Sequence, residues 1–180
     1  MRFVSRAATV LAATLFCASS LAAQVKFSVA AGATAPIGDA ADGFEMGYNA
    51  IVGLTFKPPV APVGLRVEGM YNQLAGKDPS PVGMRIMALT VSGTFSGAAL
   101  PAVYLIGGLG MYNAKATDVP AGFTAESENK FGINVGAGFN FPLPSLQPFA
   151  EVRLHHIMTA DDATGAKNTQ LVPISFGIRF

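Results

Sequence analysis

The stretch that most constrains the fold reads Phe131-Gly132-Ile133-Asn134-Val135-Gly136-Ala137-Gly138-Phe139-Asn140-Phe141. Its odd-numbered residues are all apolar, whereas its even-numbered residues are glycine or asparagine. Side chains of a β-strand point alternately to the two faces of a sheet. This period of two therefore predicts a strand with one apolar face and one small, polar face.

Seven further segments repeat this alternation, among them Met46–Phe56, whose even-numbered residues are mostly apolar. The eight predicted strands cover about 25–35, 45–57, 64–75, 84–96, 102–115, 128–141, 148–159 and 170–180. Each is long enough for a tilted strand to cross a bilayer, which takes about 9–11 residues. Longer, hydrophilic connections follow the first, third, fifth and seventh segments, and short connections rich in proline or small residues lie between them. This predicts an antiparallel meander with both termini at the short-turn end.

Composition and charge placement favour a membrane environment. The 180 residues are 51% hydrophobic and only 13% charged, against about a quarter charged in typical soluble domains. The predicted apolar faces carry no charged residue, and an arginine or lysine there would cost ~2–4 kcal/mol at mid-depth. The opposite faces carry Lys26, Lys57, Arg66, Glu68, Glu151, Arg153 and Arg179. Alternation alone leaves one alternative open, a soluble exported β-sandwich with its apolar faces buried.

A sheet that crosses lipid has to close, because an open edge would leave unpaired amide groups in hydrocarbon. We therefore predict an all-β fold, a closed antiparallel eight-stranded transmembrane up-and-down β-barrel over residues 24–180. Aromatic residues are expected to form girdles at the two membrane interfaces. The predicted girdle residues are Phe27, Phe56, Phe95, Phe141 and Phe180 near the short turns and Tyr48, Tyr71 and Tyr112 near the long loops.

The first 23 residues have the pattern of an export signal. Arg2 and Arg6 form a positive end, an apolar run follows from Ala7 to Cys17, and small residues precede a cleavage site after Ala22 or Ala23. Cys17 is the only cysteine, which excludes a disulfide framework and cysteine-based metal sites. The basic residues are scattered singly, which argues against nucleic acid as a partner. We expect no cofactor and no metal site.

Four charged residues are predicted to meet inside the barrel. Arg66 and Glu68 on the third strand lie at a depth similar to that of Glu151 and Arg153 on the seventh, which is the opposite strand. Buried without partners, such charges would each cost several kcal/mol, so we predict a crossed ion-pair cluster with a structural role. The alternatives are separate hydration of the four groups and a gate for ions. Inward glycines are expected to make room for large side chains such as Tyr104, or else to leave a cavity for a small apolar molecule.

The histidines are the only candidates for acid–base chemistry. His155 and His156 are adjacent on a strand, so they face opposite sides and cannot chelate one metal together. We predict no catalytic residue.

The last strand carries a further signal. Apolar residues occupy every second place, Ile174, Phe176, Ile178 and Phe180, and the chain ends on an aromatic residue. This resembles the C-terminal insertion signal of bacterial outer-membrane barrels, which the barrel-assembly machinery reads. With the export signal and eight strands, the mature chain resembles the small outer-membrane barrel superfamily, which includes the transmembrane domain of outer-membrane protein A, the X and W proteins, opacity-type proteins and lipid A enzymes.

The resemblance implies an integral outer-membrane protein with its longer loops outside and with outer-membrane lipid, lipopolysaccharide and the assembly machinery as partners. Lipid A deacylases of this superfamily use a His-x-Ser motif, but Ile157 and Met158 stand where that serine is required. The expected role is therefore structural or surface-interacting and not enzymatic. A narrow channel or carrier for small apolar or ionic solutes and a lipid A-modifying enzyme are the alternatives, and the pattern identifies no loop partner.

Overall fold

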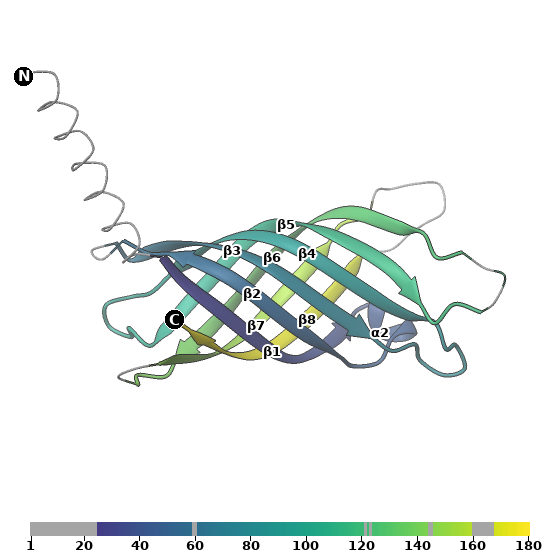
Figure 1. The fold of residues 1–180 in the computed structure, drawn as a ribbon, viewed down its shortest axis with the longest axis horizontal. Coiled ribbons are helices and arrows are strands. Elements are labelled where there is room, and N and C mark those ends of the chain that lie inside the picture. The colour runs from purple at the N-terminus through teal and green to yellow at the C-terminus, as the bar shows by residue number, and fades with distance from the viewer. Residues whose placement is uncertain (1–24, 59–60, 121, 123, 144–145, 160–167) are drawn as a thin grey trace, which may run out of the picture.

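A computed structural model describes residues 25–58, 61–120, 122, 124–143, 146–159 and 168–180. The predicted signal segment 1–23 lies outside this part of the chain. The described elements are β1 (Val25–Ile37), α2 (Ala40–Gly43), β2 (Gly47–Phe56), β3 (Val63–Leu74), β4 (Gly83–Phe95), β5 (Val103–Thr117), β6 (Ser127–Asn140), β7 (Gln147–Ile157) and β8 (Thr169–Arg179). Figure 1 shows the strands winding steeply around a common axis, with the start of β1 and the C-terminus at the same end.

The sheet is closed. Each strand pairs antiparallel with the next one along the chain, and β8 returns to pair with β1 over Ser28–Ile37. The predicted eight-stranded up-and-down barrel is thereby confirmed, with strand boundaries within a few residues of those expected. The alternative of a β-sandwich is wrong, because Phe139 and Ile174 point outward and stay 41% and 45% exposed.

Side-chain parity divides the molecule into an apolar outside and an inside that holds most of the buried polar and charged residues. In β6, Val135 is 60% exposed on the outer wall, while its neighbour Asn134 is buried in the interior. Outward apolar residues of other strands are also exposed, as Val52, Leu89, Leu105 and Phe176 illustrate. The large apolar surface of this protein thus lies outside the sheet, the reverse of a water-soluble protein.

Inward glycines make room for the largest interior side chains. The ring of Tyr104 on β5 packs directly over Gly138 on β6, where a Cβ atom would overlap it. The side chain of Arg153 likewise crosses Gly136, where a Cβ would lie 2.8 Å from the arginine Cγ. These positions support the expectation that the glycines accommodate bulky neighbours.

The first long connection differs from the expected plain loop, because it contains the one-turn helix α2. This helix lies at the long-loop end of the barrel (Figure 1), and Phe44 beyond it forms an isolated bridge with Gly76. No helix within the described ranges has the length and apolar character of a membrane span.

Closure of the barrel predicts a specific cross-link. Val29 and Ile178 are Cα partners across β1 and β8, so cysteines at these two positions, in a Cys17→Ala background, are expected to form a disulfide. Cysteines at Val29 and Ala150, two strands apart, lie roughly 10 Å or more from each other and are not expected to bridge. Altered gel mobility of the unfolded, unreduced chain measures the cross-link. An open sheet would give no bridge in either variant.

Candidate functional site

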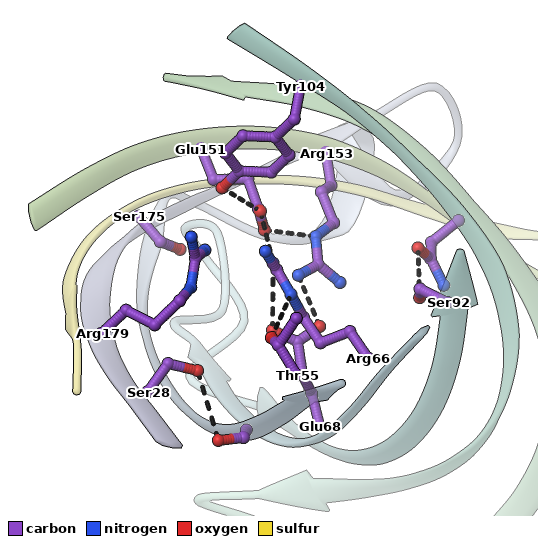
Figure 2. Close-up of polar contacts among 12 residues, drawn as sticks. Ser28, Thr55, Arg66, Glu68, Ser92, Tyr104, Glu151, Arg153, Ser175 and Arg179 are labelled. Atoms are coloured by element: carbon purple, nitrogen blue, oxygen red, sulfur yellow. Dashed lines mark hydrogen bonds and ion pairs between the residues drawn. The ribbon is translucent and has the colours of Figure 1, made fainter. Parts of the chain in front are cut away.

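Strands β3 and β7 bring four charged side chains together inside the barrel. On β3 the even-numbered residues face inward and place Arg66 and Glu68 in the lumen, and on β7 the odd-numbered residues do the same for Glu151 and Arg153. All four residues are at least 95% buried. Figure 2 shows the two guanidinium groups and the two carboxylates meeting near the middle of the lumen. The four residues expected to form a cluster are therefore in contact.

The ion pairs cross between the two strands. Arg66 Nη1 lies 2.6 Å from Glu151 Oε2, and Arg153 Nη2 lies 2.5 Å from Glu68 Oε2. Pairs within each strand complete the ring, with Arg153 Nε 2.5 Å from Glu151 Oε1 and Arg66 Nη1 3.5 Å from Glu68 Oε1. Each charge thus contacts opposite charges on both strands. We call these four residues the charge cluster.

Neighbouring strands supply further partners for the charge cluster. The Tyr104 hydroxyl on β5 donates a hydrogen bond to Glu151 Oε2 (2.6 Å), and Arg66 Nε donates to Thr55 Oγ1 on β2 (3.2 Å). The guanidinium carbon of Arg66 also lies 5.3 Å from the centre of the Tyr104 ring. Sequence reasoning did not find these contacts. Two features of the sequence could have indicated that Tyr104 lies in the lumen. Its even number places it on the inward side of β5, and an inward glycine, Gly138, faces it on β6.

A polar layer lies beyond the charge cluster, toward the long loops. Thr34 Oγ1 donates to Asn72 Oδ1 (2.7 Å), Asn49 Nδ2 donates to Thr34 Oγ1 (3.1 Å), and Ser175 Oγ donates to Asn49 Oδ1 (2.8 Å). The network joins β1, β2, β3 and β8. Around and beyond it lies an apolar layer, formed by Ile51, Met70, Leu74, Ile86, Ala88, Tyr112, Ile157 and Leu171. Side chains therefore occupy the lumen in successive layers.

The prediction of Tyr112 as a girdle residue is wrong. Tyr112 is fully buried in the lumen, where its hydroxyl lies 2.8 Å from His155 Nδ1 and its ring meets the imidazole edge-on. The reason is parity, because β5 presents its even-numbered residues to the interior. His155 faces inward as expected, and His156 points to the other side, with its Nδ1 3.2 Å from Gln170 Nε2.

The other aromatic residues expected in the girdles face outward. Phe27 stacks on Phe180 at the short-turn end, with ring centres 6.3 Å apart, and Tyr48 stacks on Tyr71 at the long-loop end, with centres 6.2 Å apart. Phe95 and Phe141 are exposed, and Phe56 is half-buried. In the terminal strand Ile174, Phe176 and Phe180 are exposed and Ile178 is half-buried.

The described residues contain no group of three or more histidine, cysteine, aspartate or glutamate side chains arranged to hold a metal ion. Within this part of the chain, the charge cluster links the two sides of the barrel. Its groups are paired with one another across the lumen, between β3 and β7.

Comparisons with known proteins support the fold. No protein-family model and no curated protein matches the sequence. Among solved structures, the chain is similar to Neisserial surface protein A, with a TM-score of 0.62, 15% identity and coverage of 86% of this chain and 94% of that one.

It is also similar to a major outer membrane protein from Thermus thermophilus (TM-score 0.54, 17% identity, coverage 87% and 99%). A third similar structure is Ail, the attachment invasion locus protein of Yersinia pestis (TM-score 0.51, 19% identity, coverage 87% and 97%). The chain thus has the fold of the small eight-stranded outer-membrane β-barrels.

The charge cluster predicts a large penalty for breaking it on one side. Glu151→Ala leaves the guanidinium groups of Arg66 and Arg153 short of a partner, so we expect the free energy of unfolding to fall by ~3–5 kcal/mol. The control is Glu128→Ala, which removes the exposed partner of the half-buried Lys130 and is expected to cost less than ~1 kcal/mol. Urea unfolding of the detergent-solubilised barrel measures both. Equal effects of the two substitutions would contradict the clustered arrangement.

The position of Tyr112 gives a second prediction. Tyr112→Phe removes the hydroxyl that partners the buried His155 and is expected to cost ~1–3 kcal/mol. Tyr71→Phe, on the outer wall, removes a hydroxyl that donates to Gln73 at 3.2 Å and is expected to cost less than ~1 kcal/mol. The same unfolding measurement compares them. A larger loss for Tyr71→Phe would place Tyr112 outside the lumen after all.

Proposed function

We propose that this chain is an integral outer-membrane β-barrel protein, exported with removal of residues 1–23, whose role is structural or surface-interacting and not enzymatic. The observation that carries the proposal is the apolar outer wall of a closed barrel whose buried charged residues lie inside, four of them paired in the charge cluster. Water is a poor solvent for such a wall, and lipid is a good one.

The geometry supports insertion into a bilayer. The strands are 10–15 residues long, enough to cross hydrocarbon when tilted. A closed barrel pairs its backbone groups between strands, which is the condition for a sheet to cross lipid. Two of the solved structures with this fold are those of a surface protein and of an outer membrane protein, which supports the outer membrane as the location.

Contacts with the envelope follow from the outer wall. Outer-membrane lipid and lipopolysaccharide would surround it, with the stacked pairs Phe27–Phe180 and Tyr48–Tyr71 at the two interfaces. Ile174, Phe176, Ile178 and Phe180 form the outward side of the terminal strand. This is the surface that the barrel-assembly machinery would recognise during insertion. The longer loops would then lie outside the cell.

The filled lumen supports a structural role over a channel or carrier. The charge cluster, the ring of Tyr104 and the apolar layer around Leu74 and Ile86 all occupy the interior. A lipid A-modifying enzyme is also disfavoured. His155 is buried against Tyr112 inside the barrel, and the residues after His156 are Ile157 and Met158 instead of serine.

Envelope fractionation combined with gel mobility tests the proposal. The mature protein is expected in the outer-membrane fraction, and the unheated sample is expected to migrate differently from the boiled one, because a closed barrel resists unfolding in cold detergent. Recovery from the periplasm as a soluble monomer would contradict it. Stable conductance of the wild-type barrel in planar bilayers would favour the channel instead.

Lipid exposure of the outer wall gives a prediction on stability. Val135 lies midway along β6 on the outer face, so Val135→Arg is expected to lower the free energy of unfolding in lipid vesicles by ~2–4 kcal/mol. Leu100→Arg introduces the same charge in an exposed short connection and is expected to cost no more than ~1 kcal/mol. If both arginines were tolerated equally in vesicles, Val135 would not face hydrocarbon.

A further inference from the structure

The lumen contains one more buried guanidinium group than it has carboxylates. Among the described residues, Arg66, Arg153 and Arg179 are buried charges of one sign, and Glu68 and Glu151 are buried charges of the other. The first two arginines and both glutamates pair within the charge cluster. Arg179, on β8, is left without a carboxylate. An unpaired buried charge is costly, so the extra guanidinium calls for an anion.

The contacts of Arg179 leave much of its hydrogen-bonding capacity unused. The residue is 8% exposed, and its Nη1 donates to Asn140 Oδ1 at 2.8 Å. Its Nε and Nη2 atoms are buried with no hydrogen-bond partner in the described part of the protein. Figure 2 shows the guanidinium pointing into the lumen toward Arg66, with no interaction drawn from it to the other labelled residues.

Aromatic rings hold this guanidinium in place. Its carbon lies 4.6 Å from the centre of the Phe149 ring and 5.6 Å from the centre of the Tyr104 ring. Such stacking orients the planar group but leaves its edge free to donate. The Nε and Nη2 positions lie along one edge, which is the fork that an anion accepts from.

The charged side chains around Arg179 at this end of the barrel are positive. Lys26 on β1 donates to Gln147, and Lys57 beyond β2 donates to Ser96, so neither lysine is neutralised by those contacts. The three short connections, residues 57–62, 96–102 and 141–146, contain no aspartate or glutamate. The described acidic residues outside the charge cluster lie instead toward the long loops. A low-dielectric cylinder with one positive end concentrates anions there.

We propose that Arg179 forms a binding site for a small inorganic anion of chloride size, which enters from the short-turn end of the lumen. The anion accepts hydrogen bonds from Nε and Nη2 and balances the third guanidinium charge. A lipid phosphate would carry its glycerol and acyl chains into a lumen that Phe149 and Tyr104 already occupy, so the site favours a free ion from solution.

Anion exchange in a nonionic, phosphate-free detergent tests the proposal, because no lipid headgroup is then present. At equal sodium concentration, the urea midpoint of the wild-type barrel is expected to be higher in chloride than in gluconate, which is a much larger anion. Arg179→Gln is expected to give equal midpoints in the two salts. Lys115→Gln removes one positive charge at the opposite end and is expected to keep the wild-type difference.

Equal midpoints for the wild type, or a difference that survives in Arg179→Gln, would overturn the proposal. Should Arg179→Gln fail to fold, the ³⁵Cl linewidth decides the question with folded protein. Wild-type and Lys115→Gln barrels are expected to broaden the chloride signal beyond that of empty micelles, and added nitrate is expected to reverse the broadening. Linewidths equal to those of empty micelles would mean that only water solvates Arg179.

Discussion

Pairing of β8 with β1 is the constraint on which the other features depend. It removes both edges of the sheet, so the backbone groups of the strands find partners within the wall and neither medium has to solvate them. Once the wall is closed, only the parity of a residue decides which side it faces. Apolar side chains can then cover the outer wall while polar and charged side chains are buried inside, as Val135 and Asn134 show within a single strand.

Closure also places opposite strands on different sides of the lumen, where only interior side chains can connect them. In a barrel wall each strand contacts mainly its two neighbours, so β3 and β7 have no direct backbone contact. The charge cluster spans the lumen between them, and Tyr104 and Thr55 attach it to β5 and β2. Burial of four charges is tolerable because each contacts opposite charges at short range. Glycines at positions such as 136 and 138 provide the space that these long side chains need.

Much of this arrangement could be predicted from local sequence. Period-two alternation gave the strands, and the alternation of long and short connections gave the topology, because both are properties of neighbouring residues. Counting residues from the short turns also predicted that Arg66 and Glu68 lie at a height similar to that of Glu151 and Arg153 on the opposite strand. This worked because an antiparallel meander of regular strands converts sequence distance into height along the barrel.

Other features depend on contacts that sequence spacing does not encode. The height of Tyr112 near the long loops predicts a girdle residue, but its even-numbered position on β5 turns its side chain into the lumen. The bond between Tyr104 and Glu151 and the Thr34–Asn72–Asn49 network depend on which rotamers fit together across strands distant in sequence. The turn of helix in α2 was also missed, since four residues are too few to show a helical period.

In a bilayer the outer wall is expected to face hydrocarbon, and the polar side chains lie inside the barrel. A nitroxide scan of residues 131–141 in lipid vesicles tests this most directly, with one label per variant and relaxation by oxygen compared with relaxation by a water-soluble nickel complex. Odd-numbered positions are expected to be reached by oxygen and shielded from nickel, with a regular period of two. Nickel access to residues 133, 135 and 137 would show that water touches this surface, and the assignment of inside and outside would be contradicted.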